Sequence, residues 1–234
     1  VSISSCCASL RLSYEYPYQS SIDLQMKYSV SEIKHREMRR LAQQEEIDTV
    51  PAFLEKPVVP YIPAFVSGEE TKQEVSQGAL RGTAVHRVLE CLDFTVIPET
   101  DIAAEVERQL EHMLEESLIT KEQAELISVE RIAEFLASDI GRRMALAAKR
   151  GQLYREKPFV LGKQEEELIL VQGIIDVFWQ EEDHIILLDY KTDRVKSGEE
   201  LCLLYRAQMD LYQEALEAVW EQKVTEKYLY SFAL

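Results

Sequence analysis

Two aspartates and a lysine lie in apolar, strand-like stretches of the sequence. Asp176 follows the stretch 168–175, Asp189 comes thirteen positions after it, and Lys191 is two positions further on. Residues two apart in a strand point to one face, so Asp189 and Lys191 should emerge together. Carboxylates at buried strand ends need a partner, and Mg²⁺ or Mn²⁺ prefers carboxylate and carbonyl oxygens. The pattern predicts metal-dependent phosphodiester cleavage, with Lys191 contacting phosphate or the attacking water.

The stretch between the two acids predicts a hairpin. Residues 178–184 have a polar middle between apolar runs, which is typical of a turn that joins antiparallel strands. Such a hairpin would bring Asp176 close to Asp189. The alternative interpretation is a solvated pair of Asp189 and Lys191 where a strand leaves the core, because structural ion pairs also occur at such places.

Length and composition favour one large domain with elaborations. The chain has 234 residues, of which 46% are hydrophobic and 29% charged, as is ordinary for a soluble globular protein. No stretch reaches the ~18 consecutive apolar residues of a membrane helix, so no membrane contact is expected. Residues 1–5 lack the basic and apolar regions of a signal peptide, which predicts a cytoplasmic location.

The cysteines and histidines do not form a recognisable metal or disulfide pattern. Cys6 and Cys7 are adjacent, whereas Cys91 and Cys202 are isolated. We therefore expect reduced thiols rather than a disulfide framework. The histidines and cysteines lack zinc-finger spacing, so no structural zinc is expected.

The formal net charge of −16 argues against strong nucleic-acid binding, because phosphate contacts depend on Lys and Arg. One resolution is that the chain binds DNA weakly by itself and a larger assembly delivers the strand. Much of the acid lies at 105–116 and 165–167, which are expected to be solvated surfaces.

The expected elements define an α/β fold. Residues 1–28 suggest an extended lead-in or edge strand, and Ser29 with Glu32 forms a capping-box pattern at the start of a helix to about residue 46. Four prolines make residues 51–70 an irregular arm. Further helices are expected at 79–92, 101–117, 121–137, 140–149 and 199–221, and strands at 153–161, 167–179, 184–191 and 227–232.

This order predicts a mixed central sheet flanked by helices, with a helical N-terminal half. Residues 1–70 would form a lead-in, a helix and an arm that pack on a core of residues 71–234, with a helical insertion at about 100–150. No GxxxxGK[ST] sequence occurs, so no ATP site is expected.

Four motifs in sequence order resemble the RecB-like branch of the PD-(D/E)xK nuclease superfamily. They are the segments 82–90 (GTAVHRVLE), 173–176 (GIID), 189–193 (DYKTD) and 208–212 (QMDLY). The resemblance covers essentially the whole chain and implies a restriction-endonuclease-like fold. Within this branch the chain is most similar to nuclease domains of bacterial helicase–nuclease complexes that repair double-strand breaks.

The resemblance assigns roles to the core residues. Asp176 and Asp189 would be the metal-binding acids, with the carbonyl of Tyr190 as a third ligand. Lys191 would stabilise charge on the scissile phosphate or orient the water. His86 would ligate or adjoin a metal, although a lone helix histidine is more often structural.

Four further residues receive lesser or positioning roles from the resemblance. Gln208 and Tyr212 are four apart on one helix face and match a QxxxY element that positions DNA or the lysine. Glu90 shares a face with His86 and would bind a second ion or hold the histidine. Glu156, an acid before a Pro-Phe pair, receives a lesser site role, since solvated glutamates are common.

The implied activity is Mg²⁺-dependent cleavage, with Mn²⁺ as a substitute, of single-stranded DNA that helicase domains of the same parent chain unwind. A second protein chain is also implied as a partner. Some nuclease domains of such complexes hold an iron-sulfur cluster through four spaced cysteines, and the cysteines here do not match that pattern. The alternatives are a catalytically silent DNA-binding or scaffold domain, and a stand-alone exonuclease or structure-specific endonuclease.

Overall fold

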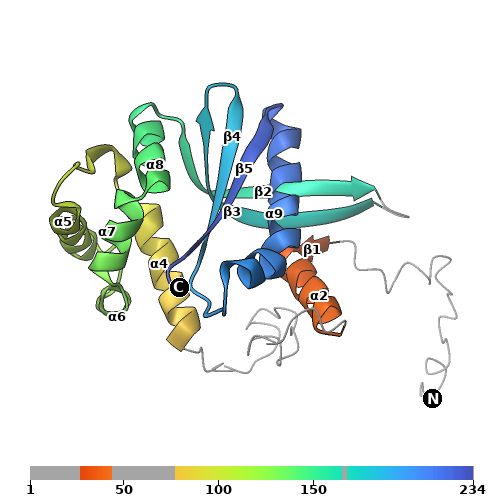
Figure 1. The fold of residues 1–234 in the computed structure, drawn as a ribbon, viewed down its shortest axis with the longest axis horizontal. Coiled ribbons are helices and arrows are strands. Elements are labelled where there is room, and N and C mark those ends of the chain that lie inside the picture. The colour runs from red at the N-terminus through yellow and green to blue at the C-terminus, as the bar shows by residue number, and fades with distance from the viewer. Residues whose placement is uncertain (1–26, 44–76, 165–167, 234) are drawn as a thin grey trace, which may run out of the picture.

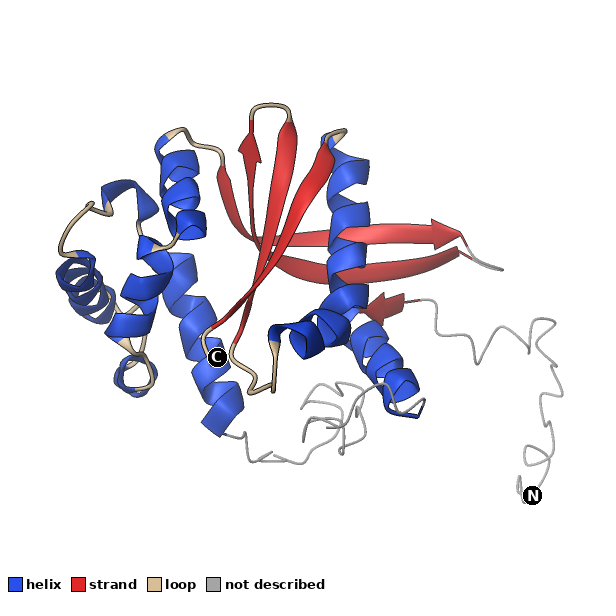
Figure 2. Cartoon of the chain, viewed as in Figure 1, coloured by secondary structure: helices blue, strands red, loops and turns tan. Residues whose placement is uncertain are grey.

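The computed structural model describes residues 27–43, 77–164 and 168–233, of which 37–43, 164 and 168 are described by their backbone alone. In this part the chain forms one mixed sheet with helices on both faces (Figures 1 and 2), which confirms the predicted fold class. The strand order is β1-β3-β4-β5, and β2 pairs with β3. The strands are β1 (Lys27–Ser29), β2 (Leu153–Gln164), β3 (Leu168–Glu181), β4 (His184–Lys191) and β5 (Lys223–Ser231).

Strand β3 changes partner along one of its edges. The antiparallel strand β2 follows one edge over nearly the full length of β3. The other edge pairs with β1 in parallel at Leu170–Gln172 and with β4 in antiparallel fashion at Val177–Glu181. Residues 173–176 lie between these two stretches, so Asp176 stands where β3 and β4 begin to diverge. A fork between strands of this kind leaves space for side chains to converge.

Strand β4 is buried on both faces. All of its residues after His184 are buried, as expected of a central strand that is covered by helices. The parallel strand β5 follows it through the crossover helix α9 (Gly198–Trp220), so β4, α9 and β5 form a βαβ unit.

Helices cover the two faces of the sheet with separate hydrophobic cores. The first face carries α4 (Gln77–Cys91), α5 (Ile102–Glu115), α6 (Lys121–Glu125), α7 (Val129–Ala137), α8 (Asp139–Lys149) and the 3-10 helix η2 (Phe94–Val96). The second face carries α2 (Val30–Gln43) and α9. Alternate residues of β4 divide between these cores, with Ile186 and Leu188 on the first and Ile185 and Leu187 on the second.

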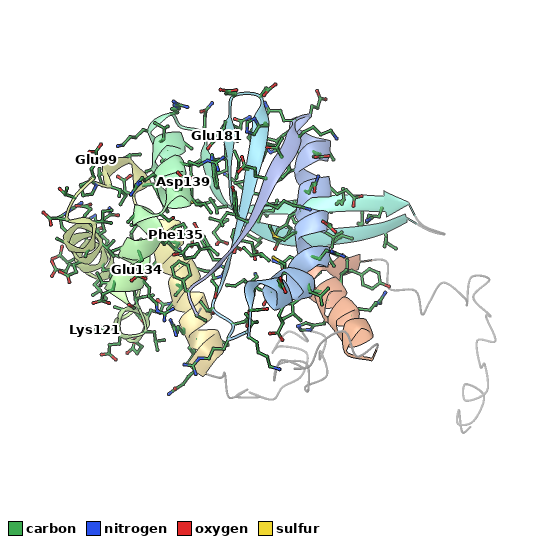
Figure 3. The ribbon with its side chains drawn as sticks, viewed as in Figure 1. Glu99, Lys121, Glu134, Phe135, Asp139 and Glu181 are labelled. Atoms are coloured by element: carbon green, nitrogen blue, oxygen red, sulfur yellow. The ribbon has the colours of Figure 1, made fainter. Side chains whose placement is uncertain are left out.

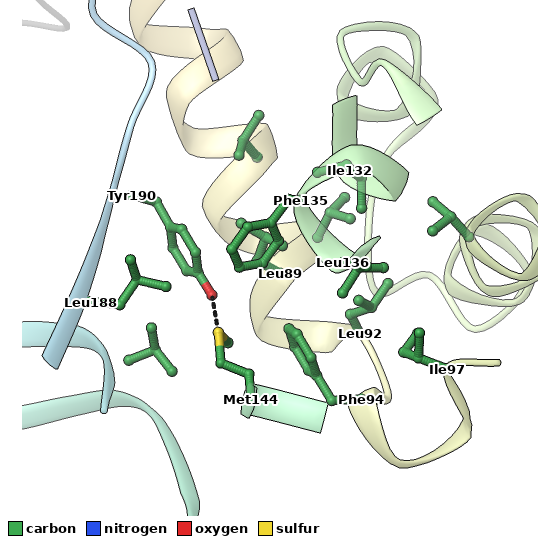
Figure 4. Close-up of a cluster of buried hydrophobic side chains, with 14 of the residues drawn as sticks. Leu89, Leu92, Phe94, Ile97, Ile132, Phe135, Leu136, Met144, Leu188 and Tyr190 are labelled. Carbon is green, nitrogen blue, oxygen red and sulfur yellow. Dashed lines mark hydrogen bonds between the residues drawn. The ribbon is translucent and has the colours of Figure 1, made fainter. Parts of the chain in front are cut away.

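The first core is built around aromatic contacts (Figure 4). Phe135 of α7 is fully buried and meets the ring of Tyr190 edge-on, with ring centroids 5.6 Å apart. The Tyr190 hydroxyl contacts the sulfur of Met144 on α8 at 4.0 Å. The side chain of Tyr190 therefore anchors the end of β4 to the helices, and its backbone remains at the fork.

The structure confirms most expected elements and corrects one. Ser29 and Glu32 form the predicted capping box, with the Glu32 amide 3.2 Å from the Ser29 hydroxyl and the Ser29 amide 2.6 Å from the Glu32 carboxylate. The single helix expected at 121–137 is wrong, because the chain forms α6 and α7 instead. Ser128 caps α7 by accepting a hydrogen bond from the Arg131 amide at 3.3 Å.

Two expectations concern residues that the structure covers only in part. Cys91 and Cys202 are free thiols. The lead-in at 1–26 and the arm at 51–70 lie outside the described residues. No helix in the described ranges is long and apolar enough to cross a membrane.

Candidate active site

The hairpin of β3 and β4 brings the two predicted acids together. Val177 pairs with Leu188, so continuing the register by one residue sets Asp176 opposite Asp189. Asp189 is fully buried and Asp176 is 9% exposed. The backbone amide of Tyr190 donates a hydrogen bond of 2.9 Å to Oδ2 of Asp176, which fixes the orientation of that carboxylate.

Three side chains could hold a metal ion, and we call them the metal cluster. They are His86 of α4, Glu156 of β2 and Asp176 of β3, whose candidate ligand atoms all lie within 4.8 Å of one another. Nδ1 of His86 is 3.5 Å from Oδ2 of Asp176 and 3.9 Å from Oε1 of Glu156. One imidazole and two carboxylates from three separate elements suit a divalent cation.

The backbone of Glu156 is strained in a way that serves this cluster. Its φ angle is +46°, which is uncommon for a residue other than glycine. Arg155 and Lys157 pair with β3, whereas Glu156 between them has no partner in the ladder. Such local irregularities redirect a side chain, and this one accompanies a carboxylate beside His86.

A chain of polar contacts leads from β4 to α9. The Lys191 ammonium forms an ion pair with Oδ2 of Asp189. The side-chain amide of Gln208 donates to Oδ1 of Asp189 at 2.8 Å and to the hydroxyl of Tyr212 at 3.1 Å. Lys191 and Gln208 are 9% and 7% exposed. Both oxygens of Asp189 are thus occupied by polar partners inside the protein.

Burial and like charge raise the pKa of Asp176 to about 7. Burial disfavours the ionised carboxylate, and the negative charge of Asp189 adds to that effect. Burial alone would lower the pKa of His86, but its contacts with Glu156 and Asp176 outweigh burial, so the pKa of His86 is raised. The metal cluster therefore holds protons that a cation would replace.

The donor set fits a hard divalent cation. Two buried acids face each other at the fork, and Lys191 pairs with only one of them, Asp189. The remaining negative charge at Asp176 and Glu156 lies beside His86, whose neutral imidazole is a common metal ligand. A cation held there would offset charges whose burial is otherwise unfavourable.

The structure places the other predicted residues less uniformly. Tyr190 contributes its backbone at the fork, while its side chain lies in the first core. Glu90 pairs with Arg87 at 2.7 Å and is not part of the metal cluster, although it lines a pocket with His86 and Glu156. Of the two lesser candidates, Glu156 and not Glu90 reaches Asp176.

Sequence reasoning missed two residues at this site, Lys34 of α2 and Tyr205 of α9. The Lys34 ammonium lies 4.1 Å from the centroid of the Tyr205 ring, and the Lys191 ammonium lies 4.3 Å from the same centroid. The hydroxyl of Tyr205 donates to Asp193. Spacing offered a signal, because residues 205, 208 and 212 lie on one face of a helix.

A cavity of about 880 Å³ opens beside these residues, and we call it the basic cleft. It extends from the N-terminal turns of α4 to α9 and reaches the metal cluster at His86. Its basic side chains include Lys34, Arg81, Lys191 and Arg194. The cleft thus joins the acids at the fork to a surface that suits an anionic ligand.

The sequence matches the PD-(D/E)XK nuclease superfamily over residues 64–233. The chain belongs to this superfamily, as the motifs predicted, and its members use divalent metal ions. The His/Glu/Asp cluster at the fork of the sheet is a possible site for such an ion.

The chain is also similar to AddA, the larger ATP-dependent helicase/nuclease protein of several bacteria. It is 35% identical over 96% of its length to the protein of Syntrophomonas wolfei, 34% over 95% to that of Alkaliphilus oremlandii and 35% over 95% to that of Thermoanaerobacter sp.. In each case the match spans 18% of the relative, so the chain corresponds to about a fifth of these longer proteins.

Proposed function

We propose that this chain is the nuclease module of a helicase–nuclease complex that acts in double-strand-break repair and recombination. It would cleave unwound single-stranded DNA with Mg²⁺, for which Mn²⁺ would substitute. The observation that carries this proposal is the convergence of His86, Glu156 and Asp176 beside the Asp189–Lys191 pair. A metal cluster next to a buried lysine is suited to phosphodiester hydrolysis.

The relatives support the wider setting. They are named as both helicase and nuclease, and the chain matches only a fifth of their length. The remainder of the parent protein would contain the helicase domains, as in AddA, and an AddB-type protein would be the partner. Delivery of the strand by such an assembly would also reconcile the net charge of −16 with a DNA substrate.

The chemistry is hydrolysis of one P–O bond. A water oxygen attacks phosphorus, the bond to the leaving oxygen breaks, and that oxygen takes up a proton. A cation held by His86, Glu156 and Asp176, with Asp189 adjoining, would lower the pKa of water and offset charge on the phosphate. Lys191 would contribute its positive charge to the phosphate from the neighbouring position.

Gln208 and Tyr212 would act at a distance from the reacting atoms. The Gln208 amide holds Asp189, which in turn holds the Lys191 ammonium. Tyr212 accepts the second hydrogen of that amide, and its own burial is nearly complete. The pair therefore orients the catalytic lysine rather than contacting substrate.

Acidic side chains outside the site lie on surfaces that a DNA strand need not approach. Glu99, Glu134 and Asp139 are exposed on the helix-rich side of the molecule (Figure 3). These residues contribute to the net charge but lie away from α9 and α2. Local charge in the basic cleft, rather than the total, would decide binding.

The test is release of acid-soluble nucleotides from single-stranded DNA with Mg²⁺, Mn²⁺ or EDTA. Asp189→Asn and Lys191→Met should abolish release. Two matched controls should retain it: Asp183→Asn, because that side chain is 98% exposed in the hairpin turn, and Lys149→Met, because Lys149 is exposed on α8. Metal-independent release, or release that survives both site substitutions, would refute the proposal.

A folded chain that releases nothing would be tested again within its parent protein and with the partner protein. Activity that appears there and is lost in Asp189→Asn would support the nuclease module. Continued absence of activity would favour the catalytically silent scaffold.

A further inference from the structure

Lys34 enters the basic cleft from a part of the chain far from the other site residues. It lies on α2, which packs on the same face of the sheet as α9. The helix begins with the buried Val30, and residues four apart share a helix face, so Lys34 continues that inward face. The position of its ammonium at 4.1 Å from the Tyr205 ring centre shows that it reaches α9.

Two ammonium groups share one aromatic ring in this cleft. Lys191 lies 4.3 Å from the Tyr205 ring centroid, so both lysines use the same ring. Tyr205 itself is 2% exposed and is tethered by its hydroxyl to Asp193. A rigid ring of this kind holds both cations on the wall of one cavity.

The proximity of like charges gives the cleft a preference for anions. Burial, followed by the positive charge of Lys191, lowers the pKa of Lys34 to about 8, against the opposing effect of Asp193 and Asp189. An anion between or beside the two ammonium groups would relieve their repulsion. Lys191 is engaged with Asp189 at the site itself, and Lys34 extends the positive charge from there along the wall of the cleft.

We propose that Lys34 binds a second backbone phosphate of the DNA strand, next to the phosphate that is cleaved at the metal cluster. This inference rests on the proposed nuclease function and adds a binding residue to it. The cleft of about 880 Å³ has room for more than one nucleotide unit and connects Lys34 to His86 along the same surface. Lys34 thereby fixes the register of the strand, which determines the bond that is presented for hydrolysis.

The experiment measures binding of a fluorescent single-stranded oligonucleotide by anisotropy, with Ca²⁺ as the metal and over a range of salt. Lys34→Met should weaken binding about tenfold and reduce the slope of log K against log salt by about 0.7, the value for one phosphate contact with a single strand. Lys34→Arg should restore most of the affinity. Lys149→Met, an equal change of charge on α8, should leave affinity and slope unchanged.

A second measurement locates the contact on the strand. Oligonucleotides with one neutral methylphosphonate linkage at successive positions should show one position that weakens binding by the unsubstituted chain but not by Lys34→Met. In cleavage assays Lys34→Met should raise KM more than it lowers kcat. A structural role for Lys34 would instead lower the melting temperature and affect all positions equally.

The inference is overturned if Lys34→Met binds with unchanged affinity and salt slope, or if no methylphosphonate position discriminates between the two proteins. It is also overturned if the unsubstituted chain does not bind the strand at all. Failure of the nuclease proposal has a different signature, because binding and its dependence on Lys34 would persist without metal-dependent release of nucleotides.

Discussion

The side-chain amide of Gln208 lies 2.8 Å from Oδ1 of Asp189 and 3.1 Å from the hydroxyl of Tyr212. One amide group thus connects the buried acid of β4 to the helix that follows it. Asp189 is fully buried, so the donor from Gln208 replaces a hydrogen bond that water cannot supply. The polar face of α9 is therefore part of the support for the acid and its lysine.

Gln208→Ala should reduce both stability and activity. It leaves a buried carboxylate oxygen without its donor, which we expect to lower the free energy of unfolding by about 1–3 kcal/mol. Tyr212→Phe keeps the bond between Gln208 and Asp189, so its rate of nucleotide release should fall much less. Urea unfolding and single-turnover cleavage measure the two effects. Equal loss of cleavage in both variants would contradict this assignment.

Glu156→Gln should weaken metal binding, whereas Glu90→Gln should not. Glu156 lies in the metal cluster with His86, and Glu90 pairs with Arg87 instead. Loss of one carboxylate ligand should reduce Mn²⁺ affinity about tenfold or more, measured by calorimetry. The two substitutions are chemically identical, so equal affinities would show that Glu156 is not a ligand.

The stability of the metal-free chain should fall as pH rises toward about 8. The folded pKa of Asp176 is about 7, above its ordinary value of 3.8, so the fold favours the protonated carboxyl. Its contribution is complete below the unfolded pKa and is lost as pH rises through about 7. The pKa of His86 is also raised, so its contribution is lost in the same direction.

Urea unfolding in EDTA at about pH 5 and about pH 8 measures this loss, which is on the order of 1 kcal/mol per unit of pKa shift. Asp176→Asn removes the titrating carboxyl and should flatten the profile. Added Mn²⁺ should stabilise the unsubstituted chain most at the higher pH, where no proton competes with the ion. A profile that rises between these pH values would refute the assignment.

Gly141→Ala should destabilise the protein even though alanine favours helices. Gly141 lies in the first turn of α8, and a Cβ atom there would lie 2.6 Å from Cα of Leu136 and even closer to the carbonyl oxygen of Phe135. These are backbone atoms that cannot easily move, so we expect a loss of about 1–3 kcal/mol. Gly198→Ala at the start of α9 is the control, because nothing lies within 4 Å of its added Cβ. Thermal unfolding of the two variants should differ in sign or clearly in size.

Local periodicity accounts for the features that the sequence predicted correctly. Alternation along β4 placed Asp189 and Lys191 on one face, and helical spacing placed Gln208 beside Tyr212. The hairpin turn that brings Asp176 to β4 was visible as a polar interruption between apolar runs. Each of these inferences depends on residues close together in the chain, for which backbone geometry is nearly fixed.

Boundaries that depend on capping were less predictable. The apolar pattern at 121–137 continues across the break between α6 and α7, so periodicity alone merged the two helices. Ser128 provides the cap that starts the second helix, but serine also occurs inside helices and on their surfaces. Packing of the two helices against different neighbours decided between these possibilities.

The sequence by itself determined the class of chemistry, the two central acids, the lysine between strand and site, and the layered α/β fold. Tertiary structure decided that Glu156 rather than Glu90 joins His86, because the positive φ of Glu156 redirects it within β2. It also decided that Lys34 enters the cleft, because α2 and α9 pack on one face of the sheet. Sequence patterns report the faces of single elements, whereas the meeting of distant side chains depends on how those faces pack.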